Sequence, residues 1–345
     1  MSSITLRQIA LAADCSRTTV SLALRNHPRI PPKTRRMISE LAAKMGYKRD
    51  PMMSTLMTRM RATPENRAVE KLAYLTWWNT PESQAQSPRD TLGFDAARRR
   101  AQQLGYDLEE FWAKEPGLST ARLNKILHTR AIRGVIVGTL PRPLGHVRLE
   151  WSRLAAVTIG YTVANHGIHR VGTDHFQGMT LAMRQLKHRG YNKIGFTSFT
   201  DQSERANRGW LAGYLTSQYR LQRNLRIPPL LVSQWSHEKF AQWMEKYKPD
   251  AVISNIPDPH LSMRQLGYKI PGDVGFATLD RIHPSVPYAG IDQVRPQVNM
   301  AAVELLVSQL ENNQFGLSDY PKTVHIDGIW RDGPTIKSEN RSKPS

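Results

Sequence analysis

Apolar residues follow helical spacing in three short segments of the first fifty residues. They recur every three or four positions in residues 5–13, 17–24 and 32–45, with polar residues between them. This period is typical of helices that bury one face, and three such faces can close around one small core. The pattern therefore predicts a self-contained bundle of three helices at the N-terminus.

The ends of these predicted helices have residue types that cap helices. Thr5 and Gln8 have the spacing of a capping box, and Ser16 is placed as the N-cap of the second helix. Pro32 suits the first turn of the third helix, and Gly46 suits its end. The apolar face of the third helix is expected to contain Met37, Ile38, Leu41, Ala42 and Met45.

The second helix combines an apolar face with short polar side chains. Its inward positions are Val20, Ala23 and Leu24, and its polar positions are Arg17, Thr18, Thr19 and Ser21. Two short helices joined by a tight turn, the second offering hydroxyl and guanidinium groups, predict a helix-turn-helix that reads the major groove of DNA. The alternative is an ordinary amphipathic helix pair from a protein core.

Beyond the first seventy residues, short apolar runs alternate with helical periods. Apolar runs of this length, bounded by turn residues, are typical of buried strands. Strands are expected at residues 72–78, 106–112, 133–140, 155–161, 230–233, 250–255 and 273–280, and helices at 93–106, 120–129, 210–218, 240–247 and 298–312. Residues 169–198 are expected to run as loop, helix and strand. This alternation predicts two parallel sheets covered by helices, with the chain crossing between them.

Residues 50–66 separate these two regions. Asp50 and Pro51 can begin a short helix, but its apolar residues, Leu56 and several methionines, need a partner such as DNA, a second copy or the next domain. Residues 63–66 have the composition of a flexible joint. We therefore expect three parts: residues 1–49, the linker 50–66, and residues 67–345.

Positive charge is densest at the N-terminus. The chain of 345 residues has a formal net charge of +19, and residues 1–61 contain 12 Lys or Arg against 3 Asp or Glu. Such a surface suits phosphate neutralisation, although a generally basic protein would also explain the excess elsewhere. The single cysteine, Cys15, excludes an intramolecular disulfide, and no signal peptide or membrane span is evident. We expect a cytoplasmic, nucleoid-associated protein.

Four motifs occur in order within the N-terminal segment: TLxxIA at residues 5–10, SxxTVS at 16–21, KTR at 33–35 and MGY at 45–47. Together they resemble the DNA-binding headpiece of the LacI/GalR (lactose-repressor) family of transcriptional regulators. The resemblance implies a homodimer, or a tetramer, on a pseudo-palindromic operator. It also implies base contacts by Arg17, Thr18 and Ser21, backbone contacts by Thr5, Ser16, Thr19, Arg29 and Thr34, and a minor-groove wedge by Leu56.

The rest of the chain resembles the effector-binding core of the same family more loosely. The matching segments are VGTDHFQG (171–178), HRGYNKIGF (188–196), WLAGY (210–214), DAVISN (250–255) and LGYKIPGDVGF (266–276). The resemblance implies an N-terminal all-α helix-turn-helix headpiece plus an α/β periplasmic-binding-protein-like core of two doubly wound parallel-sheet subdomains. Residues 256–265 are shorter than the helix-containing connection of the family.

A small-molecule effector, a sugar or sugar derivative, is implied in the cleft between the two subdomains. The residues expected to bind it are Trp78, Asn79, Trp210, Asn255 and Asp280. Trp210 stands where the family usually has arginine, and an aromatic plane can stack on a sugar ring. The alternatives are that the tryptophans belong to the core or an interface, and that Asp280 is a structural cap.

Nothing in the sequence proposes catalysis, a cofactor or a metal site. Nucleophile-elbow, phosphate-loop and dinucleotide motifs are absent. His166 and His169 are three residues apart, but no further ligand pair accompanies them. The leading hypothesis is a ligand-responsive transcriptional regulator, most simply a repressor. The rival hypotheses are a solute-binding protein, and a constitutive architectural DNA-binding protein that has lost its ligand.

Overall fold

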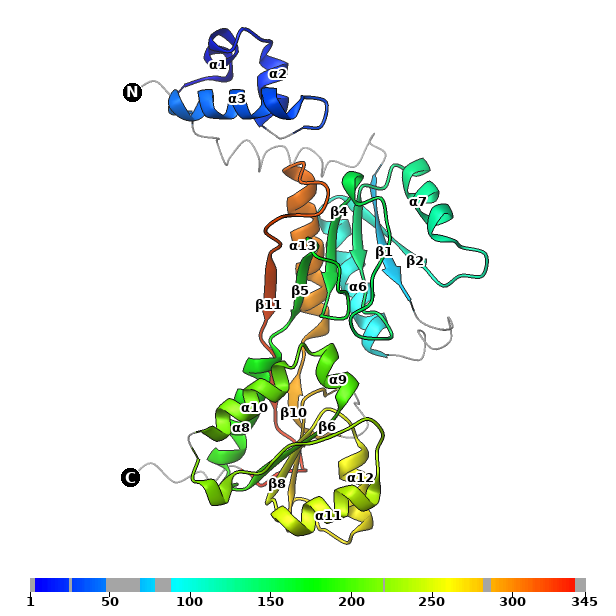
Figure 1. The fold of residues 1–345 in the computed structure, drawn as a ribbon, viewed down its shortest axis with the longest axis vertical. Helices are drawn as coiled ribbons and strands as arrows, with labels where there is room; N and C mark the ends of the chain where they lie inside the picture. Colours follow the sequence, from blue (N-terminus) through cyan, green and yellow to red (C-terminus); the bar gives the residue numbers. More distant parts are fainter. Residues whose placement is uncertain are drawn as a thin grey trace.

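The computed structural model describes residues 4–24, 27–47, 69–77, 88–219, 221–281 and 287–338, with the side chains of residues 88–91 left out. These ranges form a three-helix N-terminal domain and a larger α/β part with two sheets (Figure 1). The predicted fold class is therefore confirmed. The linker 50–66, with Leu56, and the predicted effector residues Trp78 and Asn79 lie outside the described residues. Within those residues, no helix is long and apolar enough to cross a membrane.

The N-terminal domain consists of α1 (Leu6–Ala12), α2 (Arg17–Leu24) and α3 (Pro32–Lys44). The capping box of α1 is formed: Gln8 N–H donates to Thr5 Oγ1 at 3.4 Å, and Thr5 N–H donates to Gln8 Oε1 at 2.8 Å. At the start of α2, Thr19 N–H donates to Ser16 Oγ at 3.0 Å. The capping residues therefore set these helix starts as the sequence predicts.

The three helices share one apolar core. Ile9 of α1, Val20 of α2 and Ile38 of α3 are fully buried at its centre. The expectation that Met37 belongs to the buried face of α3 is wrong, because its side chain is 49% exposed. Ala42 is buried with Ile38, and Met37 lies about 100° around the helix from Ile38, so it points away from this seam.

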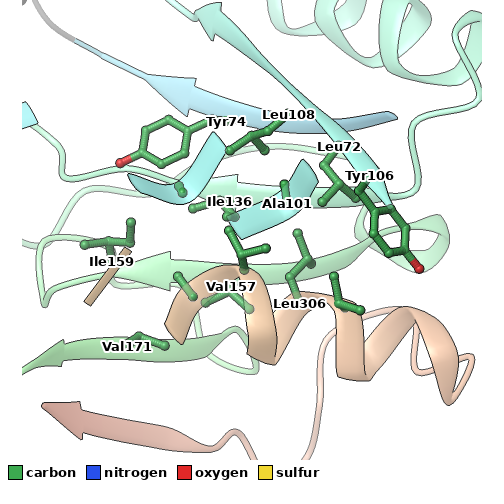
Figure 2. Packing of buried hydrophobic residues seen from close by; sticks show 14 of the residues in the cluster. Leu72, Tyr74, Ala101, Tyr106, Leu108, Ile136, Val157, Ile159, Val171 and Leu306 are labelled. Carbon is green, nitrogen blue, oxygen red and sulfur yellow. The ribbon is translucent and has the colours of Figure 1, made fainter. Parts of the chain in front are cut away.

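The first sheet has the strand order β11-β5-β4-β3-β1-β2, and all its neighbours are parallel. Its strands are β1 (Glu70–Thr76), β2 (Tyr106–Trp112), β3 (Gly134–Val137), β4 (Ala155–Ile159), β5 (His169–Thr173) and β11 (Thr323–Ile326). Helices α6 (Pro88–Gln103) and α13 (Arg295–Glu311) cover one face, and α7 (Thr120–Thr129) covers the other. Figure 2 shows Ile136 and Val157 of the sheet with Ala101 of α6 and Leu306 of α13.

The second sheet has the order β12-β10-β9-β8-β6-β7. Its strands are β6 (Ile194–Phe199), β7 (Leu230–Val232), β8 (Ala251–Ser254), β9 (Gly275–Thr278), β10 (Ala289–Asp292) and β12 (Ile329–Arg331), and only β12 runs antiparallel to its neighbour. Helices α8 (His175–His188) and α10 (Gly209–Tyr219) pack on one face. Helices α11 (His237–Tyr247) and α12 (Asp258–Gln265) lie on the other face, and α9 (Thr200–Arg205) follows β6.

The chain crosses between the two subdomains three times, after β5, after β10 and after β11 (Figure 1). These crossing segments are hydrogen-bonded to one another. Thr173 Oγ1 donates to the carbonyl of Gln293 at 3.1 Å, and Asp174 N–H donates to the carbonyl of Ile326 at 3.0 Å. The two subdomains are therefore joined by one narrow, connected hinge region.

Several elements differ from the prediction. The segment after Asn255 contains the helix α12, although no helix was expected there, and the loop expected before α8 contains the strand β5. Strands β10, β11 and β12 and the helix α9 were not predicted either. Each of these elements has eight residues or fewer, too short for a period of apolar residues to be distinct, and tertiary packing decides their conformation.

Candidate DNA-binding surface and inter-subdomain cavity

The predicted DNA contacts cluster at the N-terminal end of α2. Arg17 and Thr18 are exposed there, while Thr19 and Ser21 are half-buried. Ser16 is exposed, and its hydroxyl lies 2.8 Å from the hydroxyl of Thr19. The capping bond therefore orients two hydroxyl groups at a helix N-terminus, where backbone N–H groups also favour a phosphate.

The remaining predicted DNA contacts lie on the other two helices and the loop between α2 and α3. Thr5 is exposed and takes part in the capping box of α1. Arg29 is exposed in the loop, where its backbone N–H donates to His27 Nδ1 at 3.2 Å. Thr34 is half-buried in the first turn of α3. These positions stay predicted phosphate contacts.

A cavity of about 330 Å³ lies between the two subdomains, next to the hinge. The first sheet and α13 contribute Tyr74, Thr139, Ile159, Gly160, Tyr161, Thr162, Gly172, Thr173, Val298 and Asn299. The second subdomain and the crossing segments contribute His175, Gln202, Arg205, Ala206, Trp210, Asp280, Gln293 and Arg295. Aromatic rings and hydrogen-bonding groups line this volume together, which is typical of a site for a small polar molecule.

Two of the three predicted effector residues that the structure describes line this cavity, namely Trp210 and Asp280. The third, Asn255, follows β8 but does not line it. Its side chain is buried, and its Oδ1 accepts a hydrogen bond from Ser198 Oγ at 2.7 Å. In this conformation the hydrogen bond between Asn255 and Ser198 connects the ends of β8 and β6.

Asp280 is paired with Arg295 at the wall of the cavity. Nη2 of Arg295 lies 2.8 Å and 2.7 Å from the two carboxylate oxygens of Asp280. The Asp280 side chain is only 7% exposed, whereas that of Arg295 is 31% exposed. Because Arg295 begins α13 of the first subdomain and Asp280 follows β9 of the second, this ion pair links the two subdomains beside the hinge.

His175 and Trp210 form an aromatic pair in the cavity wall. Their ring centroids are 4.6 Å apart, and the rings are tilted by 58°. Burial lowers the pKa of His175 to about 4, against a smaller, opposite effect of the Asp280 carboxylate. The imidazole is therefore neutral at pH 7. Among the described residues, its buried Nδ1 has no hydrogen-bond partner.

Tyr161 also lines the cavity, and several side chains contact it. Its hydroxyl is hydrogen-bonded to Nε2 of His325, and the guanidinium of Arg170 lies 5.0 Å from its ring centroid. Arg170 also donates to the carbonyls of Gly160 at 2.7 Å and Val163 at 3.1 Å. Burial raises the pKa of Tyr161, so its phenol stays protonated at neutral pH.

Arg205 bridges the two subdomains across the cavity. It ends α9 of the second subdomain, which lies close to the boundary with the first (Figure 1). Its Nη1 donates to the carbonyl oxygens of Leu140 at 2.6 Å and Pro141 at 2.9 Å, both just beyond β3. These hydrogen bonds exist only while the subdomains are this close, so they stabilise the observed degree of closure.

Sequence reasoning missed His175, Arg205 and Arg295. His175 and Arg295 each lie just beyond a strand that the pattern did not reveal, β5 and β10. Had those strands been recognised, the position of both residues at a carboxyl end would have marked them, because ligands bind there in open α/β sheets. Arg205 lies in a short polar helix, and no pattern in the sequence around it predicts a position at the cavity.

A helix-turn-helix domain followed by a two-subdomain periplasmic-binding-protein-like core defines a class, the DNA-binding transcriptional regulators with that core. Residues 5–50 match the family described as "Bacterial regulatory proteins, lacI family". The predicted resemblance of the N-terminal segment to this family is confirmed. No curated protein matches the sequence significantly.

Solved structures of similar fold extend over nearly the whole chain. The lac repressor dimer bound to operator and the anti-inducer ONPF is 17% identical, with 98% of this chain and 100% of that chain covered and a TM-score of 0.57. A complex of the transcriptional regulator CelR with cellobiose is 16% identical, with 96% and 99% covered and a TM-score of 0.56. A LacI-family protein from Silicibacter pomeroyi is 18% identical, with 97% and 100% covered and a TM-score of 0.53. At these identities the likeness shows a shared fold.

Proposed function

We propose that this DNA-binding transcriptional regulator is a repressor that responds to a small molecule, a sugar or sugar derivative, bound in the cavity between its subdomains. The observation that supports this most directly is the cavity itself. It lies beside the hinge, and residues from both subdomains line it. A molecule bound there contacts both subdomains, so its binding energy depends on how they are placed relative to each other.

On DNA, the proposed assembly is a homodimer on a pseudo-palindromic operator. Two recognition helices α2 then enter the major groove one helical turn apart, with Arg17, Thr18 and Ser21 at base edges. Thr5, Ser16, Thr19, Arg29 and Thr34 neutralise or bind the phosphate backbone. Two-fold symmetry of the protein accounts for the two-fold symmetry of the site.

The effector acts, in this proposal, by changing the closure of the cleft. Trp210 offers a flat apolar surface for a sugar ring, and Asp280 offers carboxylate oxygens beside it. Any change of closure must alter the hydrogen bonds of Arg205 and the pairing of Asp280 with Arg295, since both connect the two subdomains. The new arrangement changes the spacing of the two linkers and so the affinity for the operator.

An operator-binding titration with and without candidate sugars tests this function. The operator is first selected from random duplex DNA, and its affinity is then measured by gel shift in the presence of glucose, galactose, fructose, ribose or cellobiose. We expect at least one sugar to change the affinity by about five- to 150-fold, the usual range of allosteric coupling. Sequence-specific binding that no sugar changes would show a constitutive DNA-binding protein instead.

Asp280→Ala separates the effector response from DNA binding. We expect this variant to lose the response to the sugar and to bind the same operator sequence as the wild type, because Asp280 lies in the cavity wall and not in the helix-turn-helix. Glu245→Ala is the matched control, since Glu245 is exposed on α11 and does not line the cavity. An unchanged response in Asp280→Ala contradicts the effector role of Asp280.

A further inference from the structure

A second cavity, of about 390 Å³, lies between the N-terminal domain and the first subdomain, and we call it the junction cavity. Pro28 and Arg35 of the N-terminal domain line it, together with residues near the starts of β5 and β11 and the end of α13 (Figure 1). It shares no lining residue with the cavity between the two subdomains. Its volume is within the range of sites for small molecules, so it is a separate candidate site.

The fully charged side chains that line the junction cavity are basic. They are Arg35 on α3 and Lys322 directly before β11, and no Asp or Glu of the described residues lines the cavity. The ammonium group of Lys322 is exposed and forms no ion pair within the described part of the chain. Basic groups that gather at one volume without a carboxylate create a positive potential there, which favours an anion.

His169 adds an oriented hydrogen-bond donor to the junction cavity. Its side chain is only 7% exposed, and its Nδ1 accepts a hydrogen bond from the backbone N–H of Lys322 at 2.8 Å. Burial, with a further effect of the Lys322 charge, lowers the pKa of His169, so at neutral pH the ring is uncharged and its proton is on Nε2. Nε2 has no hydrogen-bond partner among the described residues and is not enclosed. A molecule in the junction cavity can therefore accept a hydrogen bond from Nε2.

The rest of the lining offers further donors and no uncompensated negative group. The hydroxyl groups of Ser152 and Tyr320 and the side-chain amide of Gln314 line the cavity. The end of α13 also lies here, where unbonded carbonyls would repel an anion. The backbone N–H of Gln314 donates to the carbonyl of Gln309 at 2.9 Å, so the chain itself satisfies this carbonyl at the helix end.

We propose that the junction cavity binds a small anion with a phosphate group, which joins the N-terminal domain to the first subdomain. The phosphate oxygens accept hydrogen bonds from the guanidinium of Arg35, the ammonium of Lys322 and Nε2 of His169. Because His169 is almost buried, the anion must enter the cavity, which the backbone of a DNA duplex is too large to do. The bound anion fixes the position of the helix-turn-helix relative to the core. This second site goes beyond the proposed effector response.

Calorimetry on the full-length protein with pyrophosphate as the probe tests the inference. Pyrophosphate is titrated at constant ionic strength into wild type, Lys322→Gln, Arg35→Gln and Lys322→Arg. We expect the dissociation constant to rise about tenfold or more in each Gln variant, because each loses a charged hydrogen bond to the anion. Lys322→Arg keeps the positive charge and should bind nearly as tightly as wild type. Lys322 is exposed, so its replacement leaves the fold intact.

Arg36→Gln and Lys239→Gln are the matched controls. Arg36 is exposed on α3 beside Arg35, Lys239 is exposed on α11, and neither lines the junction cavity. Both should bind pyrophosphate as wild type does. No heat with the wild type, or equal weakening in all four Gln variants, overturns the site, because equal weakening is what overall charge alone gives. Weakening in Lys322→Gln but not in Arg35→Gln overturns the connection to the N-terminal domain. The sugar response is measured separately, so these outcomes leave the proposed function untouched.

Discussion

His175 is a residue whose protonation the fold changes. Its pKa falls from an ordinary value of 6.5 to about 4, because burial disfavours the charged ring and Arg295 adds repulsion, while Asp280 opposes both. Between these values the unfolded chain binds more protons than the folded one, so stability falls as pH falls from about 6.5 towards 4. The full effect of this group is about 3 kcal/mol.

Urea unfolding of wild type and His175→Phe at pH 7.5 and pH 4.5 measures this effect. We expect the wild type to lose more stability on acidification than the variant does, by about 2 to 3 kcal/mol, since Phe does not titrate. His188→Phe, exposed on the same helix, should behave as wild type. Equal losses in all three proteins would show that the His175 ring is protonated freely in the folded state.

Arg17 is the predicted DNA contact whose role depends most on the chemistry of its side chain. It is exposed at the first position of α2, where a guanidinium can form two hydrogen bonds to a guanine edge. We expect Arg17→Ala to weaken operator binding by about 1–3 kcal/mol and to relax the preference at one base pair, as measured by gel shift. Arg17→Lys keeps the charge but lacks the fork, and should lose the base preference while retaining salt-dependent affinity. Unchanged binding by both variants would remove Arg17 from the interface.

At the scale of residues, family motifs placed some of the cavity residues but not all of them. Trp210 and Asp280 were placed correctly at the cavity, because family motifs flank both. Asn255 was expected there too, but in the structure its amide bonds to Ser198 and lies outside the cavity wall. Arg205 is held at the cavity by hydrogen bonds to the backbone carbonyls of Leu140 and Pro141, which are far from it in the sequence. No local sequence pattern predicts such a pairing.

At the scale of elements, segments with a clear apolar pattern were predicted well, and segments without one were not. The strand β2 and the helix α7 begin and end where the pattern places them. The helix α13 was expected to be amphipathic, and its buried residues Val298, Val303 and Leu306 lie within one broad face, which packs against the sheet and α6. Strand β11 alternates between exposed and half-buried residues at a sheet edge, so little apolar sequence marks it.

Among the segments outside the described residues, the linker 50–66 yields a testable prediction. By resemblance, Leu56 wedges between base pairs in the minor groove and kinks the operator. We expect Leu56→Ala to weaken specific binding and to reduce DNA bending, measured by circular-permutation gel shift, while leaving the calorimetric affinity for the sugar unchanged. Bending of wild-type extent in the variant would exclude the wedge.

At the scale of the whole molecule, the predicted DNA-binding surface and the proposed effector cavity lie in different parts of the chain. The helix-turn-helix has its own core, built around Ile9, Val20 and Ile38. The cavity depends on both sheets and on three crossing segments. In the proposed function, the two parts communicate because subdomain closure alters how the two helix-turn-helix domains of a dimer are held. The division at residues 49 and 66 and the dimer remain predictions.

Selection of bound sequences from random duplex DNA by the purified full-length protein tests the central claim most directly. The account predicts enrichment of one pseudo-palindromic site, with half-sites about one helical turn apart and each protected by one subunit of a dimer. The absence of any enriched sequence, or enrichment of a single half-site bound by a monomer, would contradict it.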